Sequence, residues 1–322
     1  MGDPYIGTGA VVSIAMNADN SGTYWGGTPA TAVCTRVRPA GLKWSEVCKQ
    51  SGVEQMRVDE AFNVTGGVYY KGSVEMPASY LGLELWIQAI MDGAITDGLT
   101  DPYTHTMALA EKLMYCQIIY YTQLRNATAK SKTFTNCKVT GMKFSIEAEK
   151  EATVTFDWIG ATMAAGNTAL GTPTEIEPIL WNHLAPSINS VTTHRLYSMG
   201  FEIAAPVTEG DFGMAALTPG SLLHIERAGM RTLAIDASFL HDADVDTLAA
   251  LTTGLPMVFT FDNAGATTTN RKFVLTVGAG YREGREETDA VWGVKKTSLK
   301  WTNRKSSAPW GIVTTNSDTA IP

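Results

Sequence analysis

Two neighbouring stretches near the middle of the chain alternate strictly between apolar and polar residues. In the first, Met142, Phe144, Ile146 and Ala148 are separated by polar or charged residues, and Ala152 to Trp158 follows the same rule. A period of two places alternate side chains on opposite faces of a β-strand. Because only a short charged segment separates the two stretches, they predict a β-hairpin with one face on the core.

The same kind of reading predicts further strands and two helices. Strands are expected over 72–79, 112–122, 231–236, 256–261, 272–277 and 294–301. A broad apolar helical face covers 81–93, with Gly93 expected at the C-cap, and a second helix is opened by Asp242 and closed near Gly254. The charged stretch within 279–288 is expected to be a loop. The tail 303–322 is expected to be extended and ordered only by neighbouring molecules.

The two halves of the chain share short sequences in the same order. Ala78-Ser79-Tyr80-Leu81 precedes the first predicted helix, and Ala237-Ser238-Phe239-Leu240 precedes the second. The closing strands of the halves end in Trp158 and Trp301. This order predicts an internal duplication. We therefore expect a mainly β protein of two tandem antiparallel β-sandwich or barrel units, each flanked by one α-helix. The first unit would span 1–165 and the second 179–322, joined by a linker at 166–178 that contains Pro and Gly.

Composition narrows the classes of function. The chain has 322 residues, 44% of them hydrophobic, and a net charge of −7. An acidic chain is poorly suited to gripping nucleic acid, because phosphate contacts need clustered Lys and Arg. Its apolar runs are shorter than the roughly 20 residues that span a bilayer, and the N-terminus has no signal-peptide pattern. The four cysteines have no zinc or CxxC spacing, and we expect reduced, buried thiols.

The sequence contains few candidates for chemistry. No Walker, GxGxxG, HExxH or GxSxG motif occurs. His105 stands among threonines without a nucleophile motif beside it, which favours a structural role. Asp242, Asp244 and Asp246 alternate as Ca²⁺ ligands can, but they lack the Gly and late Glu of an EF-hand and suit a helix N-terminus. We expect no catalytic residue, no cofactor and no metal.

Several stretches resemble the tail tube (major tail) proteins of long-tailed bacteriophages. Gly72-Ser73-Val74-Glu75 leads into the helix predicted at 81–93, and Tyr103-Thr104-His105-Thr106 begins the next strand. The run from Thr135 to Met142 opens the hairpin that ends at Trp158-Ile159-Gly160. In that family a small or Cys residue after Gly or Asn opens a similar hairpin, which closes near an Ile-Gly. The second half resembles the family's C-terminal part, in which a strand, a short helix and two strands recur.

The resemblance implies a structural protein of the virion tail, made in the host bacterial cytoplasm. Such units assemble into stacked rings, and the tube conducts DNA into the host. Two units per chain favour a trimeric ring with pseudo-six-fold symmetry over a hexamer. The implied partners are other copies of the chain, a tape-measure protein and tail completion proteins. Duplex DNA would pass without specific binding, because a negatively charged lumen repels phosphates, and no membrane is involved.

The polar face of the hairpin and the pattern of charges suggest roles in such a tube for two sets of residues. The polar face of the central hairpin is expected to line the channel: Lys143, Ser145, Glu147, Thr153, Thr155 and Asp157. The mixed charges around Gly284 are expected to contact the next ring: Arg282, Glu283, Arg285 and Glu286.

Other classes of protein stay open. One is another part of the same machinery, such as a tail terminator, a distal tail protein or a contractile-type inner tube. Another is a carbohydrate-binding β-sandwich, for which Trp25, Trp292 and Trp310 would be the aromatic contacts. The third is a metal-dependent hydrolase built on the aspartates at Asp242, Asp244 and Asp246.

Overall fold

The computed structural model consists almost entirely of antiparallel β-strands, with two short α-helices among the residues it describes. Those residues are 11–17, 33–37, 41–52, 63–100, 102–111, 113–122, 130–167, 173, 177–192, 195–209, 225–251, 254–263, 271–289, 295–303 and 309–316. The predicted mainly β fold is confirmed. In this part of the chain no helix is long and apolar enough to cross a lipid bilayer.

The first half contains eleven elements of regular structure in the described residues. They are β1 (Val11–Met16), β2 (Val33–Arg36), β3 (Leu42–Gly52), β4 (Asn63–Pro77), α1 (Glu84–Met91), β5 (Asp92–Asp97), β6 (Tyr103–Leu109), β7 (Cys116–Thr122), β8 (Lys130–Glu147), β9 (Thr153–Gly160) and β10 (Thr162–Gly166).

The second half repeats a similar series. It contains η2 (Trp181–His183), β11 (Leu184–Ile188), β12 (Leu196–Ala204), β13 (Val207–Glu209), β14 (Ile225–Arg227), β15 (Thr232–Leu240), α2 (Ala243–Ala250), β16 (Leu255–Asp262), β17 (Lys272–Asp289), β18 (Lys295–Asn303) and β19 (Trp310–Asn316).

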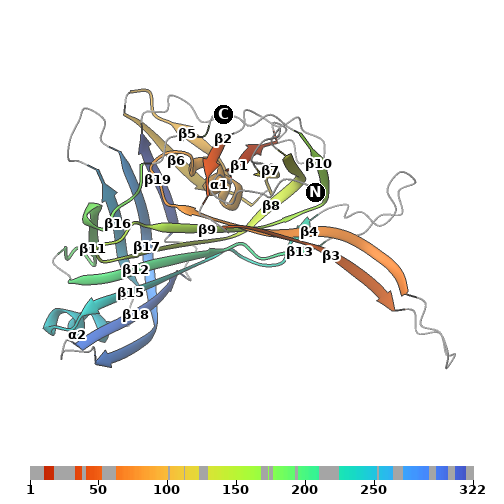
Figure 1. Ribbon diagram of the computed structural model, residues 1–322. Coiled ribbons are helices and arrows are strands. Elements are labelled where there is room, and N and C mark those ends of the chain that lie inside the picture. Colours follow the sequence, from red (N-terminus) through yellow and green to blue (C-terminus); the bar gives the residue numbers. More distant parts are fainter. Residues whose placement is uncertain are drawn as a thin grey trace.

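Strand pairing runs in the same order in both halves. In the first half β3 pairs with β4, β4 with β9, and β9 with β8. In the second half β12 pairs with β15, β15 with β18, and β18 with β17. Pairing between β8 and β12 joins the two sets. The result is one sheet in the order β3-β4-β9-β8-β12-β15-β18-β17, hereafter the eight-strand sheet (Figure 1).

The long strands β8 and β17 each pass from the eight-strand sheet into a second layer. The first part of β8 pairs with β7 and β10, and β1 pairs with β7. The first part of β17 pairs with β16 and β19, and β11 pairs with β16. The second layer of the first half also carries β2 beside β1, and the pair β5–β6, which continues onto β19. The two halves therefore share this order of strand pairing.

The core lies between these layers and is continuous across both halves. Trp86 of α1 stacks on Phe156 of β9, with ring centroids 5.1 Å apart. Phe144 of β8 stacks on Phe201 of β12 at 4.9 Å and so packs the joint between the halves. Burial of each such ring contributes about 1.5–3 kcal/mol. The apolar residues at alternate positions of the central hairpin therefore pack into the core, as their pattern predicts.

Both helices differ at their ends from the prediction. All eight residues of α1 are buried, and its C-cap is Asp92, with a φ of 61°, instead of Gly93. A short aspartate tolerates this left-handed conformation better than most side chains. In α2 the Asp242 carboxylate accepts a hydrogen bond from the Val245 amide at 2.9 Å, which confirms its capping role. That helix ends at Ala250, four residues before Gly254.

Two expectations about irregular segments are wrong. The charged stretch predicted as a loop lies inside β17, where it pairs with β18. The tail is not ordered only by neighbouring molecules, because Trp310–Asn316 forms β19 between β17 and β6 of the same chain. Thr162–Gly166 forms β10 against β8 just before the expected linker at 166–178. Most of that linker lies outside the described residues.

Candidate assembly surface

The polar face of the central hairpin lies on the side of the eight-strand sheet away from the core. Lys143 and Ser145 are exposed, while Phe144 between them is 1% exposed. Thr153, Thr155 and Asp157 are partly exposed and alternate on β9 with buried residues, and Glu147 at the end of β8 is partly exposed as well. The Ser145 and Thr153 hydroxyls are hydrogen-bonded across the hairpin at 2.8 Å. The six predicted channel residues therefore share one face.

This face continues over the second half with the same character. Ser238 on β15 and Ser298 on β18 are hydrogen-bonded at 2.7 Å, as the hydroxyls on the first hairpin are. Asp236 lies opposite Lys300 on the neighbouring strand. The face is thus made of hydroxyl groups and interleaved charges of both signs. A surface of this kind stays hydrated and offers no concentrated positive charge to a phosphate backbone.

The joint between β8 and β12 is the structural centre of this surface. Its register runs without a bulge from Glu147 opposite Ser198 to Gly141 opposite Ala204. On the polar face Lys143 and Glu202 form an ion pair of 3.5 Å across the joint. On the core face the Phe144 and Phe201 rings stack. β8, at the end of the set β3-β4-β9-β8, therefore joins β12, at the start of the set β12-β15-β18-β17, through backbone, apolar and ionic contacts together.

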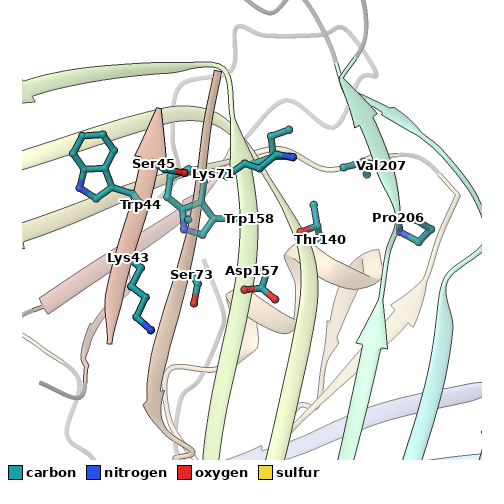
Figure 2. Close-up of a pocket in the computed structure, with 12 residues that line it drawn as sticks. Lys43, Trp44, Ser45, Lys71, Ser73, Thr140, Asp157, Trp158, Pro206 and Val207 are labelled. Atoms are coloured by element: carbon teal, nitrogen blue, oxygen red, sulfur yellow. The ribbon is translucent and has the colours of Figure 1, made fainter. Parts of the chain in front are cut away.

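A hollow of about 560 Å³ opens on the polar face near β3 (Figure 2). Its lining includes Lys43, Ser73, Asp157 and Thr140 from four adjacent strands, and Pro206 from the chain after β12. Burial raises the pKa of Asp157, and nearby Glu202 acts in the same direction against the Lys143 ammonium. Polar groups on a sheet face with a single perturbed carboxylate resemble a contact surface more than a catalytic centre.

The two ends of the eight-strand sheet differ from its interior. Among the described residues β3 has one strand partner, β4, and the part of β17 after Gly280 has one strand partner, β18. An unpaired edge carries exposed backbone N–H and C=O groups that can pair with another chain. Figure 1 also shows β3 and β4 running out of the body of the molecule as a long hairpin. Both features suit contacts with other copies.

The charged residues of β17 sit at this edge and contact α2. Arg285 Nη2 lies 2.6 Å from an Asp246 carboxylate oxygen and also pairs with Glu287. Lys295 pairs with Glu287 as well. His241, Asp246 and Glu287 place ligand atoms within 4.8 Å of one another. Because Arg285 and Lys295 already neutralise the two carboxylates, the group is better described as an ion-pair network than as a metal site.

His105 is fully buried on β6 and has an oxygen partner for each ring nitrogen. Its Nδ1 lies 2.6 Å from Asp97 Oδ1, and its Nε2 lies 2.9 Å from Asn316 Oδ1 of β19. The histidine thereby fastens the C-terminal strand to the first half. Three of the cysteines, Cys34, Cys116 and Cys137, are buried free thiols, as expected. Burial raises the pKa of Cys116 to about 12, which keeps its thiol protonated.

A buried ionic centre between the halves has no signal in the sequence pattern. Asp92 is paired with Lys138, which is 0% exposed, and with Arg231 at 2.5 Å and Arg227 at 3.1 Å. The amide of Met114 donates a hydrogen bond to the same carboxylate at 2.8 Å. Both arginines belong to the second half. Asp92 therefore fixes the second half against the C-terminal end of α1.

Comparison with known protein families matches this architecture to one family. The model of the phage tail tube protein family matches residues 59–297. The chain belongs to the phage tail tube family. The match covers α1, the strands from β4 to β17 and the joint between the halves, whereas β3 lies before it and β18 is matched only as far as residue 297. No curated protein matches the chain in sequence.

Membership of the tail tube family makes the chain a structural protein of the virion tail. Proteins of this family are generally not enzymes. Of the proposed sugar contacts, Trp310 is 7% exposed and belongs to the core. Trp25 and Trp292 lie outside the described residues.

Proposed function

We propose that three copies of the chain form a closed ring and that rings stack into the phage tail tube. Each chain would supply two β units in the order seen in the eight-strand sheet, so that three chains give pseudo-six-fold symmetry. The observation that carries this proposal is the β8–β12 joint, which links the end of the four-strand set of one half to the start of the four-strand set of the other. Repeating such a head-to-tail joint generates a closed ring when the rotation closes. A hexamer of whole chains is the alternative.

The polar face of the sheet would line the channel through which DNA passes during ejection. Lys143, Ser145, Thr153 and Asp157 lie on this face, and the stacked aromatic rings lie on the other. Hydroxyl groups and balanced charges hold water and do not retain phosphates, so duplex DNA slides past. Glu147 and Thr155 complete the proposed channel residues. A tape-measure protein and tail completion proteins are the further partners proposed.

The charged stretch of β17 is proposed to contact another copy. Sequence alone suggested the next ring for Arg282, Glu283, Arg285 and Glu286. Their position on a sheet edge instead favours a neighbour in the same ring for Arg285 and Glu286, because an edge strand extends a sheet sideways. Arg282 and Glu283, at the bulge, remain candidates for contact between rings.

Negative-stain electron microscopy of the purified chain over a concentration series tests this function. The expected result is rings or tubes with a central channel of about 20 Å or more, wide enough for duplex DNA given its groove dimensions. Discs that never stack would favour a tail terminator. A monodisperse monomer at every concentration would contradict the proposal.

A further inference from the structure

The two edges of the eight-strand sheet correspond to the two strands that meet at its internal joint. We propose that Gly284–Asp289 of β17 in one copy pairs antiparallel with Leu42–Val47 of β3 in the next copy, in the register of the β8–β12 joint. This inference rests on the proposed function and names the strands and the side chains that close the ring.

Two tryptophans establish which residues of β3 correspond to which residues of β12. Trp158 on β9 lies opposite Gly72 on β4, and Gly72 lies opposite Trp44 on β3. In the second half Trp301 on β18 lies opposite Ile235 on β15, and Ile235 lies opposite Phe201 on β12. Trp44 and Phe201 therefore occupy equivalent positions in the two halves.

A bulge establishes which residues of β8 correspond to which residues of β17. The β8–β9 ladder shifts register just before Gly141, next to Trp158. The β17–β18 ladder shifts just before Gly284, next to Trp301. Since a bulge leaves one extra residue at a defined place in the strand, Gly141 and Gly284 are equivalent.

These equivalences allow the register of the β8–β12 joint to predict the register between β17 of one copy and β3 of the next. Phe144 follows the bulge glycine of β8 by three residues, so its equivalent on β17 is Glu287. At the internal joint Phe144 lies opposite Phe201, and Glu287 of one copy should therefore lie opposite Trp44 of the next. The neighbouring pairs follow: Glu286 with Ser45, Arg285 with Glu46, and Thr288 with Lys43.

The charges at the two edges are complementary in this register. Arg285, which pairs with Asp246 and Glu287 in its own copy, would also meet the carboxylate of Glu46 of the next copy. Glu287, which pairs with Lys295 in its own copy, would also meet Lys132, whose ammonium group lies 3.8 Å from the centre of the Trp44 ring. A register slipped by one residue would turn every side chain of β17 to the opposite face and lose both contacts.

The two edges carry charged residues at positions where the internal joint carries apolar residues. The internal joint buries Met142 opposite Ile203, whereas the equivalent pair at the edges is Arg285 and Glu46. Charged residues on an exposed edge strand hinder indiscriminate pairing before assembly. Opposite charges across the proposed joint would then select the correct partner and register.

Disulfide trapping tests the register directly. In the doubly substituted chain Ser45→Cys/Glu286→Cys, the new thiols face each other across the proposed joint, within the usual Cα separation of a disulfide, about 4.4–6.8 Å. Oxidation of the assembled protein should give a ladder on a denaturing gel that ends at three chains. Ser45→Cys/Ser298→Cys is the matched control, because Ser298 lies opposite Glu286 on β18 and is one strand further away. It should cross-link far less.

The single variants distinguish other arrangements. Ser45→Cys alone and Glu286→Cys alone should remain single chains on the gel, and they also report any contribution from the native thiols. A disulfide that joins position 45 of two copies of the Ser45→Cys chain, located by peptide mapping, would mean that β3 pairs with β3, which would overturn the inference. A ladder of the double variant that continues without limit would also overturn it, because the contact would then run between rings.

Charge reversal gives a second readout. Glu46→Arg should reduce cross-linking of the Ser45→Cys/Glu286→Cys chain several-fold, and adding Arg285→Glu should restore it. Rings in the microscope without the specific cross-link would overturn this inference and leave the proposed function standing. Absence of any ring or tube would contradict the proposed function itself.

Discussion

Gly72 shows how a single missing side chain positions the core of the first half. A Cβ atom at this position would lie 2.3 Å from Cζ2 of Trp158. The indole is held there by a hydrogen bond of 2.7 Å from its Nε1 to the Tyr120 hydroxyl. The ring cannot move aside without breaking that bond, so the glycine is required by packing.

Gly72→Ala should therefore lower the free energy of unfolding by about 1–3 kcal/mol, the usual cost of overpacking a core. Gly311→Ala on β19 is the control, since a Cβ there meets nothing within 4 Å. Urea unfolding followed by tryptophan fluorescence measures both variants. Equal stability of the two would show that the Trp158 contact does not constrain the core.

The carboxylate of Asp92 compensates buried positive charge. Asp92→Asn keeps the shape of the side chain and tolerates the left-handed backbone, but it leaves Lys138 and Arg231 without their counter-charge. Breaking a buried pair in this way costs about 3–5 kcal/mol. Thermal unfolding should show a large loss of stability, whereas Asp246→Asn, in the exposed pair with Arg285, should change the melting temperature little. A small effect of Asp92→Asn would mean that water reaches the centre.

Asp157 and Glu147 should respond to pH with opposite signs. Burial raises the pKa of Asp157 in the folded state, so the folded protein binds the proton more tightly and loses stability as pH rises above about 3.8. Hydrogen bonds from Lys150 and Tyr197 lower the pKa of Glu147, so its contribution is present at neutral pH and is lost on acidification.

Melting temperatures between pH 3 and pH 7 test this pair. Asp157→Asn should be more stable than the unsubstituted protein at pH 7, and the gap should close toward acid. Glu147→Gln should be less stable at pH 7, and its gap should also close toward acid. A stabilised Asp157→Asn would indicate that the carboxylate is retained for the channel surface and not for folding. The same sign for both variants would contradict the assignment.

At the scale of elements, β19 joins the halves. It pairs with β17 of the second half and β6 of the first, and Asn316 at its end bonds to His105 and to the Tyr80 carbonyl oxygen. Within the described part of the chain this strand closes the second layer across both halves.

A chain that ends after Asn303 should consequently lose cooperative unfolding or fail to accumulate in soluble form. A chain that ends after Asn316 keeps every contact of β19 and is the control. Circular dichroism and denaturant titration compare the two. Unchanged stability of the shorter chain would show that the strand is dispensable.

The elements that sequence predicts well are those with one face in the core. The central hairpin alternates cleanly because Phe144 and Phe156 face the core while Ser145 and Thr155 face outward. The charged part of β17 breaks this rule because it is an edge strand whose side chains are exposed on both faces, and its composition therefore resembled a loop.

β19 was missed for the opposite reason. Two of its buried positions hold Thr314 and Asn316, so its inward face does not read as apolar. Asn316 is accommodated there by hydrogen bonds to groups more than 200 residues away in the sequence, which no local pattern contains. The buried ion pairs of Asp92 were missed likewise, because partners such as Arg231 lie far along the chain. The sequence pattern was enough to predict the polar face of the candidate surface but not which strands form its edges.

At the scale of the whole molecule, one chain contains one closed strand joint and, at its two sheet edges, the two strands that could form a second joint with other copies. The internal joint between β8 and β12 is closed within the chain. The edges at β3 and β17 would form the same joint only with further copies. In the proposed ring of three, each copy would contribute one joint of its own and share two with its neighbours.

Native mass spectrometry of rings released from the assembled protein tests this account most directly. Three chains of 34.6 kDa in each ring is the predicted result. Six chains would contradict the equivalence of the two halves around the ring and favour the hexamer. A single chain under every condition of assembly would contradict the ring itself.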